Sequence, residues 1–231
     1  MSTKTTVNEE AVVILEDRKD DYHLKVTMLD DEVTWYMNGQ PIMFTDAQGS
    51  WPCYQLELSG VSGKDNKILV GGLGFGFTSQ QAEAFGPVTT VEILQSVVDL
   101  YRSAFPDQPL HIVVSDFCDY IKYTDKMFDY ILLQLDFVGF DLGYQFCIDS
   151  NKNIYTKPFM SMLSSKLNEN GVFVTEGLAE KGKDSPVKLL FEDCGFFVKE
   201  ERNDFSPLKG AEDCENVEHV VWICTKGKND E

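Results

Sequence analysis

The apolar positions of the chain follow two patterns, one before and one after residue 60. In the first part, short runs rich in apolar and β-branched residues are separated by polar residues, as in strands that bury one face. Asn38-Gly39 tolerates positive φ and predicts a tight hairpin turn. The predicted strands are Val12–Leu15, His23–Met28, Val33–Tyr36 and Pro41–Phe44. This part therefore reads as a small antiparallel β unit.

The second part follows a linker rich in Gly and Ser, Ser59–Asn66, and alternates strand-like runs with stretches of helical periodicity. Such alternation is typical of a parallel sheet with crossover helices. The predicted strands are Lys67–Gly71, Val88–Ile93, His111–Ser115, Asp129–Leu133, Val172–Thr175, Phe196–Glu200 and His219–Thr225. The predicted helices are Thr78–Phe85, Ser96–Phe105, Tyr155–Leu167 and Val187–Asp193.

The two patterns together define the predicted fold class and domains. The class is α/β, a Rossmann-like and mostly parallel sheet of seven strands preceded by a small N-terminal antiparallel β unit. We assign residues 1–60 to the β-hairpin unit with its connecting segment and residues 61–231 to the Rossmann-like domain.

Composition narrows the class of protein. Of 231 residues, 43% are hydrophobic and 25% charged, and no apolar run approaches the roughly 18 residues of a membrane span. Residues 1–10 are polar and acidic, unlike a secretory signal. The six cysteines form no C-x-x-C pair, and the three histidines are far apart. We expect a cytoplasmic protein with reduced cysteines, no metal site and no membrane segment.

The net charge of the chain indicates which class of binding partner to expect. A formal charge of −18 opposes binding to nucleic acid, which depends on Lys and Arg neutralising phosphates. It favours a cationic small-molecule acceptor, although an acidic surface also serves solubility alone. The sequence leaves open a homodimer.

A glycine-rich loop supplies the first candidate chemistry. The buried-strand run Ile68-Leu69-Val70 ends in Gly71-Gly72-Leu73-Gly74-Phe75-Gly76, and a helical stretch follows at once. Glycines let a backbone turn sharply close to a nucleoside, and a helix amino terminus presents N–H groups to a polar ligand. Gly72, Gly74 and Gly76 are therefore candidate cofactor-binding residues.

Two carboxylates end the next two predicted strands. Glu92 follows about twenty residues after the loop, where such folds bind the hydroxyl groups of a ribose. Asp116 follows the third strand and could accept a hydrogen bond from an adenine amino group. The alternatives are a solvated glutamate for Glu92 and a helix amino-terminal cap for Asp116.

Over most of its length the sequence resembles the spermidine synthases, the polyamine aminopropyltransferases within the class I S-adenosylmethionine-dependent methyltransferase superfamily. The most specific similarity is Ile154-Tyr155-Thr156-Lys157-Pro158-Phe159 followed by Leu167-Asn168-Glu169-Asn170-Gly171-Val172-Phe173-Val174. The segments Asp21–Val26 with Asn38-Gly39, the glycine loop, Val91-Glu92, Ser115-Asp116 and Phe128–Leu132 also match in order. The resemblance implies a donor, S-adenosylmethionine or its decarboxylated form.

The departures from that family concern its acidic residues. The family's glycine loop usually contains an aspartate that holds the amine of the aminopropyl donor, whereas this loop offers only Leu73, Phe75 and glycines. The family's catalytic aspartate falls at or near Gln134, which cannot act as a base. Asp136 could substitute for it, or be an ordinary loop residue. Loss of both acids favours S-adenosylmethionine as donor and methyl transfer as reaction.

The resemblance also implies where the acceptor binds. Residues Phe137–Asn153 combine aromatic and acidic side chains, which suit an amine through cation–π attraction and charge pairing. Packing of these aromatics onto the sheet is the alternative. The candidate acceptor residues are Tyr54, Gln55, Phe137, Tyr144 and Tyr155, and the catalytic candidates are Asp136 and Gln134.

Three functional hypotheses follow. The first is a methyltransferase acting on a small amine-bearing acceptor, and the second is an aminopropyltransferase using decarboxylated S-adenosylmethionine. The third is a non-catalytic relative that binds a nucleoside or a partner. A nicotinamide dehydrogenase is a weaker fourth, because the Tyr155–Val174 similarity has no place in it.

Overall fold

The computed structural model describes residues 11–19, 22–29, 32–45, 61–133, 154–183, 185–204 and 217–227. The chain forms two compact units, Met1–Pro52 and Cys53–Glu231. Residues 46–60, which contain the predicted boundary, lie outside the described ranges. The two units are therefore taken separately.

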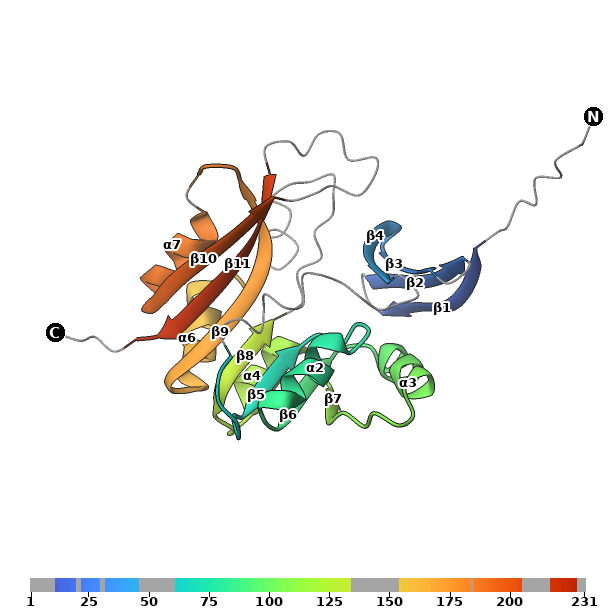
Figure 1. Cartoon of the computed structure of the whole chain (residues 1–231), viewed down its shortest axis with the longest axis horizontal. Helices are drawn as coiled ribbons and strands as arrows, with labels where there is room; N and C mark the ends of the chain where they lie inside the picture. Colours follow the sequence, from blue (N-terminus) through green and yellow to red (C-terminus); the bar gives the residue numbers. More distant parts are fainter. Residues whose placement is uncertain are drawn as a thin grey trace, which may run out of the picture. The chain divides into compact units, whose positions relative to one another are not determined.

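The first unit is a four-stranded antiparallel sheet in the order β1-β2-β3-β4 (Figure 1). Asn38 and Gly39 have φ of 51° and 84°, as their hairpin turn requires, and Asn38 Oδ1 accepts from the His23 N–H at 2.8 Å. Leu24, Val26 and Trp35 are buried on it. The strands are β1 (Val12–Lys19), β2 (Tyr22–Leu29), β3 (Glu32–Met37) and β4 (Gln40–Thr45).

The second unit is a seven-stranded sheet in the order β10-β11-β9-β8-β5-β6-β7. Strands β9, β8, β5, β6 and β7 run parallel, and β11 is antiparallel to both β9 and β10. The predicted fold class is thus confirmed. The strands are β5 (Ile68–Gly71), β6 (Val88–Glu92), β7 (Ile112–Val114), β8 (Phe128–Leu133), β9 (Leu167–Glu180), β10 (Phe196–Asp204) and β11 (Val217–Lys226).

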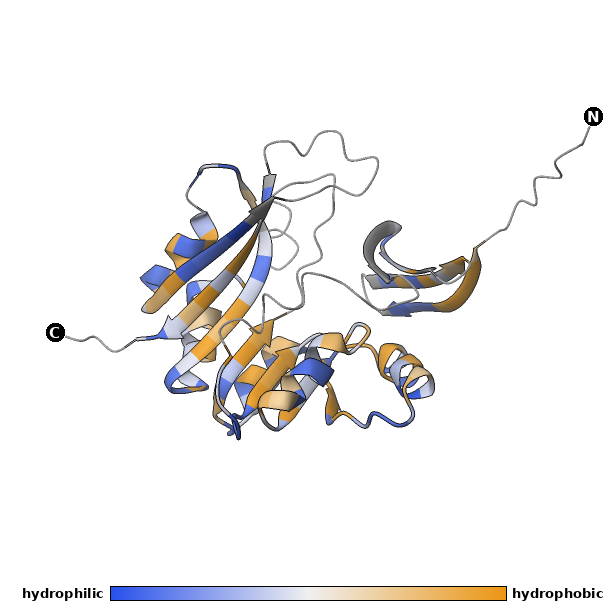
Figure 2. Cartoon of the chain, in the orientation of Figure 1, coloured by the Kyte–Doolittle hydropathy of each residue, from blue (hydrophilic) through white to orange (hydrophobic). Residues whose placement is uncertain are grey.

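Apolar residues of the sheet are buried on both faces, as parallel strands require, and the central strands are largely apolar in Figure 2. One core cluster joins the sheet to Phe117 and Phe159 from two helices and to Phe191 from a third. The other includes Ala82 of the helix after the glycine loop. The helices are α2 (Phe77–Ala82), η1 (Glu83–Phe85), α3 (Gln95–Ala104), α4 (Phe117–Tyr123), α6 (Lys157–Ser165) and α7 (Pro186–Asp193).

Element boundaries differ from the prediction where side chains or pairing override periodicity. Helix α6 begins at Lys157 because Thr156 caps it by accepting from the Phe159 N–H, so Tyr155 precedes the helix. Leu167, predicted as the end of that helix, begins β9. Strand β9 extends to Glu180 because its last residues pair with β11. None of the described helices is long and apolar enough to cross a membrane.

Candidate functional site

The glycine loop joins β5 to α2 and is built by backbone geometry. Gly72, Gly74 and Gly76 have φ of 92°, 48° and 79°, in the left-handed region that favours glycine. The Gly72 N–H donates to the carbonyl of Val91 at 2.8 Å, which fixes the loop beside the end of β6. The three predicted cofactor glycines thus form one tight turn at the carboxyl end of a central strand.

The start of this loop is closely surrounded by side chains. A Cβ added at Gly71 would lie 2.8 Å from carbons of Leu133 and Phe117, closer than real Cβ contacts. A larger residue would require the Phe117 ring and the Leu133 side chain, or the backbone itself, to shift. A glycine at position 71 therefore lets the Phe117 and Leu133 side chains pack directly against the backbone at the start of the loop.

Glu92 ends β6 and faces the loop. Its side chain is buried, with the residue 9% exposed. Oε2 accepts from the Leu73 N–H at 3.0 Å and Oε1 from the Leu94 N–H at 2.9 Å. A carboxylate is an acceptor of the kind that ribose hydroxyls require, and this one is fixed beside the loop by two backbone N–H groups. Glu92 and the glycine loop, predicted separately, are brought into direct contact.

Asp116 lies at the end of the neighbouring strand. The Ser115 N–H donates to the Glu92 carbonyl at 2.9 Å, which puts the ends of β7 and β6 side by side. Asp116 is the N-cap of α4, and its Oδ1 accepts from the Asp119 N–H at 3.0 Å. The capping alternative is therefore observed. A contact with adenine stays a prediction, and the side chain is exposed at the same edge as Glu92.

Tyr155 is packed into the apolar core. It is 9% exposed, and its ring centroid lies 6.3 Å from that of Phe191. The hydroxyl lies 3.5 Å from Thr175 Oγ1, which donates to the Leu133 carbonyl at 3.4 Å. Thr175 thus links the Tyr155 hydroxyl to the end of β8, and the role of Tyr155 toward an acceptor stays a prediction.

The remaining predicted residues lie outside the described ranges. They are Tyr54, Gln55, Gln134, Asp136, Phe137 and Tyr144.

Sequence reasoning missed several groups that support the loop. The Leu94 N–H holds Glu92, and Thr90 Oγ1 donates to Ser79 Oγ at 2.8 Å between β6 and α2. Tyr101 of α3 packs on Gly76. Helical periodicity predicted a helix over Ser96–Phe105, but no local signal in the sequence pairs Tyr101 with a loop some 25 residues earlier.

The structure offers no metal centre among its described residues, where no three His, Cys, Asp or Glu side chains cluster. Cys118, Cys194 and Cys224 are free thiols. Burial, with the nearby Asp116 and Asp119 carboxylates, raises the pKa of Cys118 to about 12. Cys118 is therefore a protonated, unreactive thiol at neutral pH.

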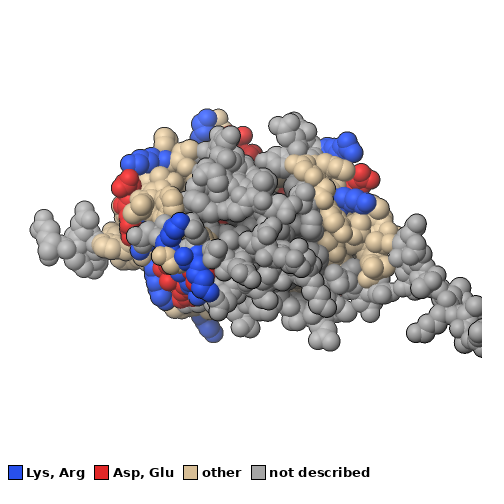
Figure 3. Space-filling model, turned by 90° about the horizontal axis from the view of Figure 1, so that it is seen from above, with Lys and Arg blue, Asp and Glu red and all other residues tan. Residues whose placement is uncertain are grey.

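Figure 3 shows charged side chains of both signs among the described residues of one face. There the described Lys and Arg residues lie interspersed with Asp and Glu. The expectation that nucleic acid is not the partner stays a prediction.

Comparisons in sequence link the chain to polyamine aminopropyltransferases. It is 30% identical over 87 residues to the enzyme of Thermococcus onnurineus, covering 37% of this chain and 27% of the relative. It is 30% identical over 120 residues to that of Pyrobaculum calidifontis, covering 47% of this chain and 40% of the relative. The matches thus span less than half the length of either relative. No protein-family model matches the chain.

Comparisons in structure agree on the fold. Spermidine synthase from Thermotoga maritima has a TM-score of 0.66 at 16% identity, over 94% of this chain and 73% of that one. A spermidine synthase bound to the transition-state analogue AdoDATO has a TM-score of 0.67 at 17% identity, over 94% of this chain and 74% of that one. Human methyltransferase-like protein 13 in complex with SAH has a TM-score of 0.54 at 16% identity, over 78% of this chain and 82% of that one. The chain is therefore similar in sequence to polyamine aminopropyltransferases and has the Rossmann-like fold that they share with class I methyltransferases.

Proposed function

We propose that this protein is an S-adenosylmethionine-dependent transferase that methylates a small amine-bearing acceptor. The observation that carries the proposal is the buried Glu92 carboxylate, which faces a glycine loop with three positive φ angles. Ligands of open α/β sheets bind at the carboxyl ends of the strands, where this pair lies. Structural relatives with the same fold bind AdoDATO and SAH, which supports an S-adenosyl nucleoside as ligand.

The residues fit such a donor. Glu92 would accept from the ribose hydroxyls, and the backbone of Gly72, Gly74 and Gly76 would let the nucleoside approach closely. Asp116 would accept from the adenine amino group with the oxygen that does not cap α4. When bound, the donor supplies a methyl group on a positively charged sulfur. The work left to the protein is to exclude water and to hold donor and amine in line, which can lower a barrier by about 7–11 kcal/mol.

The choice of methyl over aminopropyl transfer depends on the charge of the loop. Its side chains are Leu73 and Phe75, and Leu73 is buried at 4% exposure. No carboxylate of the loop could pair with the lone ammonium of a decarboxylated donor, and burying an unpaired ammonium costs several kcal/mol. S-adenosylmethionine carries its own carboxylate beside the ammonium, and it avoids that penalty.

The similarity to polyamine aminopropyltransferases favours a second candidate. In it the donor is decarboxylated S-adenosylmethionine, the acceptor is a polyamine, and Asp136 replaces the acid lost at Gln134. The absence of acidic residues from the loop is also compatible with a third candidate, a non-catalytic relative that binds a nucleoside.

The proposed location is the cytoplasm, in keeping with the free thiols of the described cysteines.

Ligand binding tests the donor first. We expect S-adenosylmethionine and methylthioadenosine to stabilise the purified protein, by about 2.7 kcal/mol at one hundred times the Kd, and NAD to leave it unchanged. Decarboxylated S-adenosylmethionine should bind more weakly than S-adenosylmethionine. Stabilisation by NAD alone would contradict the proposal.

Product mass tests the reaction. The protein is incubated with each donor and a panel of di- and polyamines, and the product is read for one added methyl or one added aminopropyl group. An aminopropyl product at comparable efficiency would establish the second candidate. Binding without any product would favour the non-catalytic relative.

A single substitution tests the charge argument directly. Asp tolerates left-handed φ, so Gly74→Asp can place a carboxylate in the loop where φ is 48°. We expect the affinity for decarboxylated S-adenosylmethionine relative to S-adenosylmethionine to rise about tenfold, the scale of one charge-assisted hydrogen bond. Gly74→Asn is the neutral control of equal size. An unchanged ratio in Gly74→Asp would mean that loop charge does not select the donor.

A further inference from the structure

The aromatic ring of Tyr101 closes the space beside the last glycine of the loop. Tyr101 lies on α3 and is 3% exposed. A Cβ added at Gly76 would lie 2.9 Å from Tyr101 Cδ2 and closer still to Cε2. Gly76 also has a φ of 79°, so ring contact and backbone conformation both restrict this position to glycine.

The hydroxyl of Tyr101 connects the same ring to the helix that follows the loop. Gln80 Nε2 donates to Tyr101 Oη at 3.0 Å, and Oη donates to the Gln108 carbonyl at 3.1 Å. Gln80 itself begins a helical bond, because its N–H donates to the Gly76 carbonyl at 2.9 Å. Tyr101 therefore contacts Gly76 through its ring and the first turn of α2 through its hydroxyl.

The protonation state of Tyr101 suits this arrangement. Burial raises its pKa, against the lowering effect of the hydrogen bond from Gln80 and with a further increase from the charge of Glu83. The hydroxyl thus stays protonated across the physiological range and can donate to the Gln108 carbonyl while accepting from Gln80.

The loop is consequently held at both ends by side chains that follow it in sequence. Glu92 accepts from the Leu73 N–H at the start, and Tyr101 packs on Gly76 at the end. We propose that Tyr101 is a positioning residue of the donor site, which sets the conformation of Gly74–Gly76 against which the nucleoside lies. This inference rests on the proposed function for the identity of the ligand, but the contact with the loop stands without it.

A purely structural role is the competing explanation, because Tyr101 also packs on Phe105 with ring centroids 5.2 Å apart. The matched control is Phe105→Leu, which removes the aromatic ring that packs on Tyr101 at the end of α3 but keeps the Tyr101 side chain that contacts Gly76. The conservative variant is Tyr101→Phe, which keeps the ring and loses the hydroxyl. Tyr101→Leu removes both.

The first measurement is hydrogen exchange of the amides of residues 72–80 in the absence of ligand. We expect Tyr101→Leu to speed their exchange at least tenfold, Tyr101→Phe to speed it less, and Phe105→Leu to leave it within twofold of the parent. Equal acceleration in Tyr101→Leu and Phe105→Leu would overturn the inference. This readout does not depend on the proposed function.

The second measurement is the Kd of methylthioadenosine. If Tyr101 positions the loop, Tyr101→Leu weakens binding about tenfold or more, while Phe105→Leu at a similar melting temperature changes it less than twofold. The positioning role would be refuted if the parent protein and the Tyr101→Leu variant bound methylthioadenosine with the same affinity. A parent that binds no S-adenosyl nucleoside would refute the proposed function and, with it, the ligand named here.

A double-mutant cycle keeps the inference testable if Tyr101→Leu lowers stability. Gly76→Ala is made in the parent and in Tyr101→Leu, and urea unfolding gives the free-energy change of each. We expect Gly76→Ala to cost clearly less in the Tyr101→Leu background, because the missing ring no longer meets the added methyl. Strictly additive changes would show that the ring does not close the space at Gly76.

Discussion

Glu92 has an observed structural role, and the proposed function adds a second role as a ligand contact. Its two oxygens hold the backbone of the glycine loop at Leu73 and of the turn into α3 at Leu94. A carboxylate that orders two backbone segments contributes to stability, and it would contribute to affinity as well if it also contacted the ligand. Loss of activity on substitution would therefore not by itself identify a ligand contact.

Substitution of Glu92 should separate the two roles. Glu92→Ala leaves the N–H groups of Leu73 and Leu94 without their acceptor, so we expect a loss of about 1–3 kcal/mol of unfolding free energy, measured with urea. Methylthioadenosine binding should fall by about 1–3 kcal/mol beyond that effect. Glu169→Ala, an exposed position, is the control and should stay within about 0.5 kcal/mol. A variant Glu92→Ala that binds as well as the parent would disprove the assignment to the ribose.

Cys118 provides a residue-scale test of burial. Because its pKa is about 12, the thiol should alkylate slowly at pH 8 in the folded protein and rapidly in guanidinium, as followed by peptide mass spectrometry. The unfolded thiol ionises near pH 8.5, so the contribution of Cys118 to stability is present below that pH and is lost as pH rises above it. Equal labelling rates in the folded and unfolded protein would contradict this prediction.

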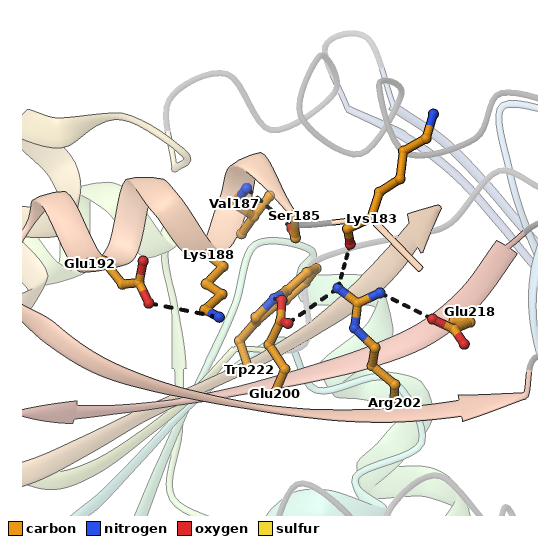
Figure 4. A network of polar contacts seen from close by, with 9 residues as sticks. All are labelled: Lys183, Ser185, Val187, Lys188, Glu192, Glu200, Arg202, Glu218 and Trp222. Carbon is orange, nitrogen blue, oxygen red and sulfur yellow. Dashed lines mark hydrogen bonds and ion pairs between the residues drawn. The ribbon is translucent and has the colours of Figure 1, made fainter. Parts of the chain in front are cut away.

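At the scale of elements, a polar network ties the last two strands to the turn after β9 (Figure 4). Arg202 of β10 donates to Glu218 at 3.1 Å, to Glu200 at 3.2 Å and to the Lys183 carbonyl at 2.7 Å. The indole N–H of Trp222 donates to the other oxygen of Glu200 at 2.9 Å. One guanidinium thus serves two carboxylates and a backbone carbonyl near a buried indole.

Removal of Arg202 should be more costly than removal of an exposed ion pair. In Arg202→Met the carboxylates of Glu200 and Glu218, whose side chains are 12% and 16% exposed, lose a shared cation. We expect a loss of about 1–3 kcal/mol in urea unfolding. The control is Lys199→Met, which breaks an ion pair whose lysine is 69% exposed and should cost less than about 1 kcal/mol. Similar losses in the two variants would indicate that the network adds nothing beyond surface charge.

The whole molecule is acidic, with 38 Asp and Glu against 20 Lys and Arg. Such an excess destabilises the compact state through self-repulsion, and salt screens it over about 10 Å at 0.1 M. That the protein forms a homodimer remains a prediction.

The melting temperature should therefore rise when NaCl is increased from 10 to about 300 mM, as measured by calorimetry. A neutral solute at equal osmolality is the control for non-ionic effects. A fall in melting temperature with NaCl would mean that attractive pairs such as the Arg202 network outweigh the net repulsion.

Prediction from sequence succeeded where local chemistry and periodicity agreed. Asn38-Gly39 formed the predicted turn, and the strand before Gly71 formed β5. Prediction was less accurate at element boundaries that strand pairing decides. The predicted strand Val172–Thr175 is part of β9, which continues to Glu180 because its last residues pair with β11. It placed a helix over Tyr155, whereas the side chain of Thr156 starts α6 two residues later.

The sequence by itself determined the order of strands and helices, the glycine loop and the carboxylate after the next strand, because periodicity, turn residues and spacing are local properties. Only the tertiary structure decided that Glu92 bonds to Leu73, that Tyr101 closes the space at Gly76 and that Tyr155 is packed in the core. These contacts depend on how strands and helices far apart along the chain pack together. Because protein interiors are closely packed, these contacts are set by how the side chains of several segments fit together, and no single segment determines them.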